Sequence, residues 1–330
     1  MPNVPAMSVV IVTPDHYQTI RKTIRHLRVQ TAAASLEIVV VAPQRSSLGL
    51  TEAEFEPFHS LQIVEVGSLR VLAPAKVPAV RRARAPIVAF AEDHCYPERE
   101  WAAALINAHQ SNWAAVGPVL RNANPRTMTS WAGFILYFGT FAEPAAAQVT
   151  EHLPWHNSSY KRELLLHYGD DLASLLVVEG MLLDDLRAKG HELYFEPAAK
   201  TAHVNISLPS SWLKQSFWGG RLYGAFRAQK KQWPLSRRLL YAGGAPLIPP
   251  LRAWRALKTI RRTGRQRELL PRIFPALIAG VIPHALGEAT GYILGAGNAE
   301  QHYSHFETRR RLHLTASDRR AQANANEQYD

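Results

Sequence analysis

Residues 86–94 read PIVAFAEDH, a short apolar run that ends directly in two carboxylates and an imidazole. A continuous apolar run of this length suits a strand that is buried on both faces of a parallel sheet. Further runs of this kind stand at residues 8–13 (SVVIVT), 36–42 (LEIVVVA), 61–66 and 114–120. The sequence therefore predicts a mostly parallel sheet, with Glu92, Asp93 and His94 immediately after one of its strands.

Helical patterns alternate with these strands. Helices are expected at residues 17–30, 98–112 (after Pro97) and 178–189 (before Gly190). A last strand is expected within residues 191–197, followed by a loop that carries His203. The alternation predicts an open α/β sheet with right-handed crossovers, in which ligands bind at the carboxyl ends of the strands.

The composition excludes several classes of protein. Of the 330 residues, 47% are hydrophobic and 20% are charged, which is the ratio of a globular protein and not of a disordered one. A single cysteine excludes an internal disulfide scaffold and favours a reducing compartment. The first residues lack a basic region followed by a long apolar run, so no signal peptide is expected there.

The formal net charge of +11 is concentrated in one stretch. Residues 204–272 hold fifteen Lys and Arg side chains against one acid, Glu268, while the remainder of the chain is slightly acidic. A basic segment of this kind typically binds a polyanion, which can be a membrane surface, a nucleic acid or a phosphorylated substrate.

Within this stretch, residues 251–265 have the pattern of a basic amphipathic helix. A helical wheel places one group of cations on one side: Arg252, Arg255, Lys258, Arg262 and Arg265. Trp254, Leu257 and Ile260 fall on the other side, which we expect to be the apolar face.

Two short apolar runs follow, at residues 273–287 and 289–297. The first has 15 residues, fewer than the roughly 20 that cross a bilayer, so a re-entrant or interfacial position is expected. Gly287, Gly291 and Gly295 recur every four residues, which permits close contact between helices. The apolar runs argue against a nucleic acid as partner, since a soluble RNA-binding protein does not need them.

The order of several segments resembles family-2 glycosyltransferases, the inverting enzymes with a GT-A fold. The segments are SVVIVTPDHYQTIRKTIRHLRVQ (8–30), LEIVVVAPQ (36–44), RRARAPIVAFAEDH (81–94), NSSYKRELL (157–165) and EGMLLDDLRAKGHELYFEPAAKTAH (179–203). The resemblance implies a Rossmann-like GT-A sheet, a divalent metal (Mg²⁺ or Mn²⁺) and a nucleotide-diphosphate sugar as donor. Three positions depart from the family pattern: Pro43-Gln44 replace an Asp, Glu92-Asp93-His94 replace the DxD motif, and Glu179-Gly180 replace a Glu-Asp pair.

Glu92, Asp93 and His94 have two interpretations. Carboxylates and an imidazole at a strand end can hold a divalent cation, and we assign Glu92 and Asp93 to the donor and Asp93 and His94 to the metal. Alternatively, Asp93 caps the helix that follows. The resemblance places His203 near the diphosphate or the metal as a third ligand, although a loop histidine is often only a hydrogen-bonding residue.

The resemblance assigns the catalytic base to Glu179, with Asp184 and Asp185 as alternatives. A carboxylate beside the apolar run LASLLVV can have a raised pKa that suits proton abstraction from a sugar hydroxyl. The alternative is a solvated first-turn glutamate that the helix dipole favours. Asp184 and Asp185 can equally face water, and Asp185 with Lys189 is an ordinary i,i+4 ion pair.

Other candidates have similar alternatives. For donor binding they are Thr13 and Pro14, which end the first strand, with Arg81 and Arg84, which precede the strand at residues 86–91. For the acceptor side they are Trp131, His156, Asn157 and Arg162. Each arginine can bind a phosphate group or be exposed to solvent. Trp131 can line the acceptor site or pack in the hydrophobic core.

We therefore expect three regions: a GT-A domain at residues 1–205, a membrane-associated helical region at 206–300, and a loose polar tail at 301–330. The predicted function is metal-assisted, inverting transfer of a hexose to a saccharide or lipid-linked acceptor in polysaccharide biosynthesis. The predicted location is the cytoplasmic face of the inner membrane, where the basic region contacts anionic lipid. The alternative is a non-catalytic GT-A-like protein that binds nucleotide sugars or membranes.

Overall fold

The computed structural model of the chain describes residues 4–154 and 157–327, except for the side chains of Glu179 and residues 324–327. The chain forms two compact units. The first contains Met1–Arg121 and Ala145–His203, and the second contains Asn122–Pro144 and Val204–Asp330.

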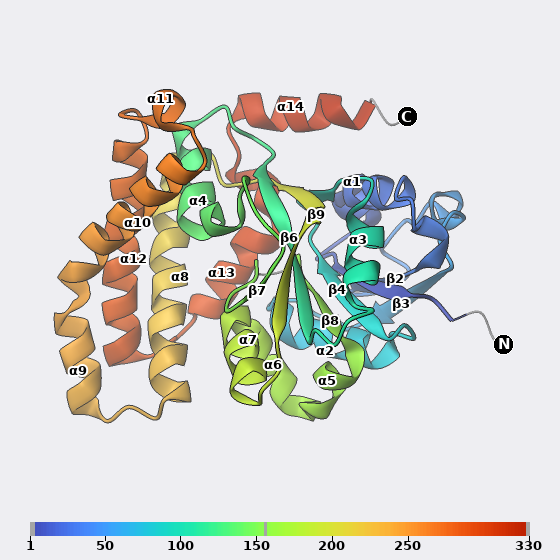
Figure 1. Cartoon of the computed structure of the whole chain (residues 1–330), viewed down its shortest axis with the longest axis horizontal. Helices are drawn as coiled ribbons and strands as arrows, with labels where there is room; N and C mark the ends of the chain where they lie inside the picture. Colours follow the sequence, from blue (N-terminus) through green and yellow to red (C-terminus); the bar gives the residue numbers. More distant parts are fainter. Residues whose placement is uncertain (1–3, 155–156, 328–330) are drawn as a thin grey trace. The chain divides into compact units, whose positions relative to one another are not determined.

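A sheet of nine strands among the described residues forms the first unit (Figure 1). The strands are β1 (Met7–Val12), β2 (Leu36–Ala42), β3 (Ser60–Glu65), β4 (Ile87–Ala91), β5 (Cys95–Pro97), β6 (Ala115–Asn122), β7 (Gln148–Thr150), β8 (Ser159–Lys161) and β9 (Leu193–His203). Their order is β3-β2-β1-β4-β8-β6-β9-β5, with β7 also paired to β9. The predicted strands are present, but the last of them continues to His203, which we expected in a loop after the strand. The antiparallel insertion of β8 between β4 and β6 was not foreseen.

Parallel pairing fixes which residues meet at one edge of this sheet. β1 pairs with β2 and β4, with Val12 opposite Val41 and Ile11 opposite Ala91. Every residue of β1 and β2 is buried, as the continuous apolar runs predict. The residues that follow β1 and β4 therefore share the carboxyl edge of the sheet.

The helices of this unit are α1 (Tyr17–Arg28), α2 (Leu72–Arg82), α3 (Trp101–Ala108), α5 (Arg162–His167), α6 (Leu172–Val177) and α7 (Glu179–Ala188). The helix after Pro97 begins later than expected, because Pro97 is the last residue of β5 and pairs with Thr201. The helix that ends before Gly190 is confirmed, and Gly190 has the positive φ of 85° that suits a glycine stop.

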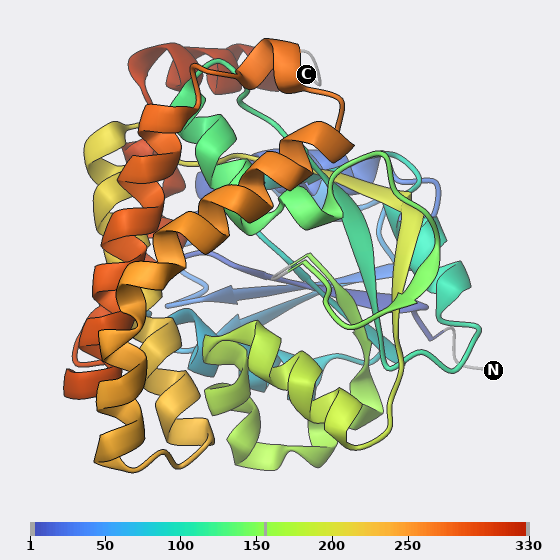
Figure 2. The same ribbon diagram turned by 60° about the vertical axis from the view of Figure 1, so that its left-hand side comes forward.

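Helices form most of the second unit, and Figure 2 shows α10 running obliquely beside α12. The helices are α4 (Met128–Tyr137), α8 (Pro209–Lys230), α9 (Leu235–Gly243), α10 (Ile248–Arg262), α11 (Gln266–Leu269), α12 (Phe274–Leu294), α13 (Ala299–Thr308) and α14 (Ala316–Glu327). The two apolar runs expected at 273–297 are one continuous helix, α12, with Pro283 inside it. Among the described helices, α12 alone is long and apolar enough to cross a membrane by length and composition, and half of its apolar window is buried.

Glycines allow α8 and α12 to pack backbone against backbone. A β-carbon built on Gly220 or Gly224 of α8 would overlap the carbonyl oxygen of His284 or Glu288 on α12. The converse holds for Gly287 and Gly291 of α12, where a β-carbon would overlap carbonyl oxygens of α8. The close helix contact inferred from the glycine spacing is therefore present at Gly287 and Gly291.

The tail is not loose up to residue 327, because α13, a short 3₁₀ helix and α14 occupy it. Asp318 is buried, and its carboxylate accepts a hydrogen bond from the Asn124 amide at 3.2 Å. Asn124 also donates to the Asn205 carbonyl at 2.8 Å. This polar network ties the tail to residues 122–144, a segment that the sequence did not separate from the first unit.

Candidate metal and donor site

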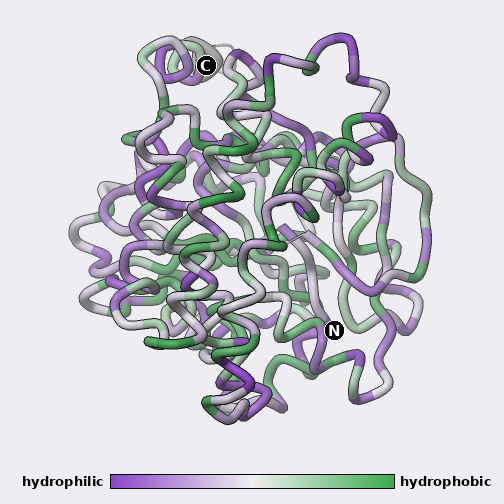
Figure 3. The backbone as a smooth tube through the Cα atoms, turned by 90° about the vertical axis from the view of Figure 1, so that its left-hand side faces the viewer, coloured by the Kyte–Doolittle hydropathy of each residue, from purple (hydrophilic) through white to green (hydrophobic). Residues whose placement is uncertain are grey.

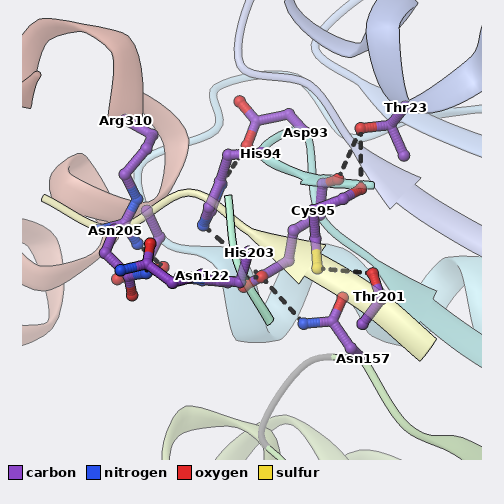
Figure 4. A network of polar contacts seen from close by, with 12 residues as sticks. Thr23, Asp93, His94, Cys95, Asn122, Asn157, Thr201, His203, Asn205 and Arg310 are labelled. Carbon is purple, nitrogen blue, oxygen red and sulfur yellow. Dashed lines mark hydrogen bonds and ion pairs between the residues drawn. The ribbon is translucent and has the colours of Figure 1, made fainter. Parts of the chain in front are cut away.

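The candidate site lies where β4 and β9 end, and it gathers three residues with metal-binding donor atoms (Figure 4). Glu92 and His94 follow β4 directly, and His203 is the last residue of β9. β5 joins these two places, because Cys95 lies opposite His203 in its antiparallel pairing with β9. Two segments about a hundred residues apart in the sequence thus meet at one point.

The geometry of the cluster is compact. Glu92 Oε2 lies 3.6 Å from His94 Nε2 and 3.5 Å from His203 Nε2. The two imidazole rings meet edge to face, with their centroids 4.9 Å apart. Both histidine side chains are buried, so their ring nitrogens are held in place by packing.

Asp93 orients His94 and does not cap a helix. Its Oδ1 lies 2.5 Å from His94 Nδ1, and the next helix starts only at Trp101. When Nδ1 carries the proton and donates it to this carboxylate, the lone pair of His94 is on Nε2, the nitrogen that lies 3.6 Å from Glu92 Oε2. In metalloproteins, a carboxylate that accepts the other ring N–H of a metal-binding histidine has this orienting role. The residues whose possible ligand atoms lie together are thus Glu92, His94 and His203, whereas Asp93, which we expected as a ligand, contacts His94.

Neighbouring elements fix the backbone of this loop. The Thr23 hydroxyl of α1 donates to the Glu92 carbonyl at 2.9 Å. Cys95 Sγ and Thr201 Oγ1 lie 3.0 Å apart and link β5 to β9 (Figure 4). Asn157, which is buried, directs its amide nitrogen to Glu92 Oε2 at 3.3 Å. The sequence placed Asn157 on the acceptor side, but it contained no signal for the supporting roles of Thr23 and Thr201.

The donor set fits a divalent cation such as Mn²⁺. Ligand atoms about 2.1 Å from one ion lie about 3 to 4.2 Å apart, depending on the angle between them. The two separations from Glu92 Oε2, 3.6 and 3.5 Å, fall in this range. Two imidazoles with one carboxylate are ligands that Mn²⁺ and Zn²⁺ accept, while Mg²⁺ prefers oxygen alone.

Thr13 and Pro14 lie at the same edge of the sheet as this cluster, since they follow β1, the parallel neighbour of β4. The Thr13 side chain is buried and donates to the His16 carbonyl at 3.0 Å, so it shapes the turn. His156 lies outside the described residues, and its predicted role stays a prediction.

Arg84 does not belong to the donor site. Its Nε donates to Glu37 Oε1 at 2.7 Å, and its backbone N–H donates to Glu37 Oε2 at 2.8 Å. Arg84 precedes β4 and Glu37 lies at the start of β2, so both are at the amino edge of the sheet, opposite the strand ends. The prediction for Arg84 is therefore wrong.

Two further arginines stand at this amino edge. Arg81, in the last turn of α2, is paired with Asp170 at 2.6 Å. Arg162 donates from Nε to the Val80 carbonyl at 3.0 Å and from its terminal nitrogen to the Arg81 carbonyl at 2.9 Å. Arg162 thereby satisfies carbonyls at the C-terminus of α2, and neither arginine has the expected ligand-binding position.

Replacing Glu37 by glutamine is expected to lower the free energy of unfolding at neutral pH by about 1–3 kcal/mol without changing donor binding. Burial alone raises the pKa of Glu37, but hydrogen bonds from Ser8, Arg84 and Gln62 outweigh it and hold the pKa below its ordinary value. A carboxyl with a lowered folded-state pKa stabilises the protein above the unfolded pKa, and this stabilisation is lost as the pH falls through the folded pKa.

Urea denaturation at neutral and acidic pH measures this effect, and the difference between native protein and Glu37→Gln should disappear in acid. Glu163→Gln, at an exposed position of the same unit, is the matched control and should leave stability unchanged. A donor KM that rises in Glu37→Gln at unchanged stability would contradict the structural role.

Trp131 is a packing residue of the second unit. It is buried in α4, and its indole N–H donates to the Pro125 carbonyl at 3.0 Å. The Arg265 guanidinium lies 4.7 Å from the ring centroid. Both polar and apolar parts of the side chain are thus used within the unit, which favours packing over the acceptor-lining role that we predicted.

The base candidates lie on α7. Glu179 is the first residue of this helix, as expected, but its side chain lies outside the described residues. Asp184 is exposed and lies 4.0 Å from Arg187, while Asp185 pairs with Lys189 at 2.8 Å and accepts from the Tyr168 hydroxyl. Asp184 and Asp185 therefore form ion pairs with basic residues in or just after the same helix, which was the alternative to a catalytic role. Glu179 stays the predicted base.

No protein-family model matches the chain, and no curated protein sequence matches it. Solved structures do match. The mannosyltransferase PcManGT from Pyrobaculum calidifontis, in complex with GDP-Man and Mn²⁺, has 18% sequence identity and a TM-score of 0.53, covering 86% of this chain and 87% of its own. S. aureus TarS 1–349 has 15% identity and a TM-score of 0.46, covering 86% of this chain and 90% of its own.

GalNAc-T7 with UDP, GalNAc and Mn²⁺ matches at 14% identity and a TM-score of 0.44, over 62% of this chain. The chain spans 44% of the length of that protein. The match to the mannosyltransferase runs over most of both chains. The chain therefore has the GT-A fold, a mostly parallel α/β sheet followed by a helical C-terminal region.

Proposed function

We propose that the protein is a metal-assisted glycosyltransferase of the inverting, family-2 type that uses a nucleotide-diphosphate sugar. The observation that carries the proposal is the convergence of Glu92, His94 and His203 at the carboxyl edge of a GT-A sheet. This edge is where open α/β sheets bind their ligands. The mannosyltransferase of similar fold was solved with GDP-Man and Mn²⁺, which supports a donor of this class.

Three residues would hold the cation, through Glu92 Oε2, His94 Nε2 and His203 Nε2. When bound, a divalent cation neutralises the charge that builds on a departing diphosphate. Asp93 keeps the proton of His94 on Nδ1, so that Nε2 stays available as a ligand atom. Thr13 and Pro14, at the end of the adjacent strand, would border the nucleotide.

Glu179 at the start of α7 is proposed to remove the proton from the acceptor hydroxyl. The hydroxyl oxygen then forms a bond to the anomeric carbon while the bond to the diphosphate breaks, which inverts the configuration in one step. The acceptor is a saccharide or a lipid-linked sugar, and the transferred sugar is a hexose.

Glu179→Gln is expected to reduce sugar transfer by about 10²–10⁴-fold while leaving donor and Mn²⁺ affinity unchanged, because only proton transfer is lost. Asp184→Asn, five residues further along the same helix and exposed, is the matched control and should keep full activity. A screen of sugar nucleotides with Mn²⁺ identifies the donor, and calorimetry measures its affinity for each variant. Equal loss in both variants would remove Glu179 from the base assignment, and full activity in Glu179→Gln would do the same.

The alternative, a GT-A-like protein that binds nucleotide sugars without turnover, predicts donor binding but neither transfer nor hydrolysis. The same screen separates the two functions. The absence of donor binding under all metal conditions would contradict both.

A further inference from the structure

Large apolar side chains are exposed on adjoining elements of the second unit, which is unusual for a protein surface. Leu240 on α9 is 72% exposed, and Leu247 in the short 3₁₀ helix before α10 is 73% exposed. Trp254 on α10 is 58% exposed, and it lies on the side of the helix that the helical wheel gave as apolar. α12 packs against α9, α10 and this 3₁₀ helix, so the exposed side chains stand on neighbouring elements.

α12 extends this surface along its whole length. Its exposed residues recur at nearly every fourth position: Phe274, Ile278, Ile282, Leu286, Ile293 and Leu294. Residues at this spacing lie on one face of a helix. Figure 3 looks onto this side of the unit, where hydrophobic stretches (green) run along the helices. We call the exposed apolar residues of α9, the 3₁₀ helix, α10 and α12 the apolar face.

The opposite side of α12 packs against other parts of the second unit. Gly287 and Gly291 touch the backbone of α8, and buried Glu288 accepts a hydrogen bond from Tyr292 at 2.5 Å. Arg227 of α8 donates to the same tyrosine hydroxyl at 3.0 Å. A helix that carries such a polar network on one side is not surrounded by lipid, so α12 presents only its outer half to a neighbour.

Cations accompany the apolar face. Exposed basic side chains stand on or beside the same elements: Lys230, Lys231, Arg237, Arg255, Lys258, Arg261 and Arg272. Glu268 is the one acid in residues 204–272, and it is paired with Arg265 at 2.5 Å. The potential around the apolar face is therefore strongly positive.

We propose that the apolar face docks the second unit on a lipid bilayer with anionic headgroups, without crossing it. The leucines, isoleucines and Trp254 would enter the boundary between headgroups and acyl chains, and the cations would contact the phosphates. A second copy of the chain is the other candidate for covering an apolar face of this size. A two-fold dimer would place each basic surface against the same surface of its partner, so charge complementarity favours anionic lipid. The proposal does not depend on the sugar-transfer chemistry.

Flotation of the full chain with vesicles tests the proposal. We expect binding to vesicles of phosphatidylcholine mixed with phosphatidylglycerol, and much weaker binding to phosphatidylcholine alone. The double variant Leu240→Glu/Leu247→Glu should weaken binding by about 100-fold, because two leucines that would enter the bilayer are lost and two negative charges are introduced. Leu312→Glu is the matched control: Leu312 is 57% exposed in the same unit but lies on a different 3₁₀ helix, so binding should fall far less than in the double variant.

An environment-sensitive dye gives a readout of position. Cys95 is 1% exposed, so a cysteine introduced as Leu247→Cys can be labelled selectively in the folded protein. Its emission should shift to the blue on vesicle binding, while a dye at Leu312→Cys should not shift. No binding to either vesicle, or equal binding by the double variant, would overturn the proposal. A native dimer in solution that becomes monomeric in the double variant would also overturn it, by assigning the apolar face to a second copy.

Discussion

His203→Ala is expected to reduce Mn²⁺-dependent sugar transfer and donor hydrolysis by on the order of 10²–10³-fold. The physical reason is that His203 Nε2 is one of three donor atoms that converge on one point, 3.5 Å from Glu92 Oε2. Two remaining ligands would bind a cation weakly and without fixed geometry. Mn²⁺ affinity, measured by calorimetry or by electron paramagnetic resonance, should fall together with activity.

Two further variants make this result specific. Asp93→Asn retains the shape of the side chain but removes the charge that faces His94 Nδ1, so Mn²⁺ affinity should fall by about 10–100-fold. His167→Ala, at an exposed histidine of the same unit, should change nothing. The expected order of loss is His203→Ala, then Asp93→Asn, then His167→Ala. Native Mn²⁺ affinity in a folded His203→Ala variant would show that the cluster is not the metal site.

The strands of the fold could be predicted because their signal is local. The runs at β1, β2 and β4 are apolar on both faces, and this pattern indicates a covered parallel sheet without knowledge of any partner. β8 has three residues, too few for a pattern, so its antiparallel insertion beside β4 depends on contacts that only the folded chain makes.

The sheet pattern alone places Glu92, Asp93 and His94 at the carboxyl edge, because they follow a strand of the parallel sheet. His203 was expected near them only through the family resemblance. The choice between Glu92 and Asp93 as ligand depends on side-chain direction in a short loop, which spacing does not determine. Arg84 was misassigned for a similar reason, since its partner Glu37 is 47 residues away in the sequence and gives no local signal.

The amphipathic pattern of α10 does not determine what each side of the helix contacts. The wheel separates apolar from basic residues, but it does not identify which side meets the protein. On the apolar side, Ile260 is buried whereas Trp254 is exposed. On the basic side, Arg262 donates to the carbonyls of Ala142 and Gly139 at 3.0 and 2.6 Å. The face of α10 that packs is therefore partly polar, and part of its apolar surface is left outside.

Gly287→Ala is expected to destabilise the second unit by about 1–3 kcal/mol, a large effect for one added methyl group. The new β-carbon would overlap the Phe217 carbonyl oxygen, which belongs to the backbone of α8 and cannot rotate away as a side chain does. The helices must separate, and the contacts along their interface are weakened together. Thermal and urea denaturation measure the loss, and Gly243→Ala is the control, because a β-carbon there has no atom within 4 Å.

The double variant Gly224→Ala/Gly287→Ala tests whether the contact between α8 and α12 acts as a unit. Gly224 meets the Glu288 carbonyl and Gly287 meets the Phe217 carbonyl, so both substitutions force the same two backbones apart. Once one substitution has separated the helices, the β-carbon of the second alanine no longer overlaps the facing backbone. The combined loss should therefore be smaller than the sum of the two single losses, as expected for coupled sites. Additive losses would mean that each glycine is accommodated locally and that the two helices do not move as rigid bodies.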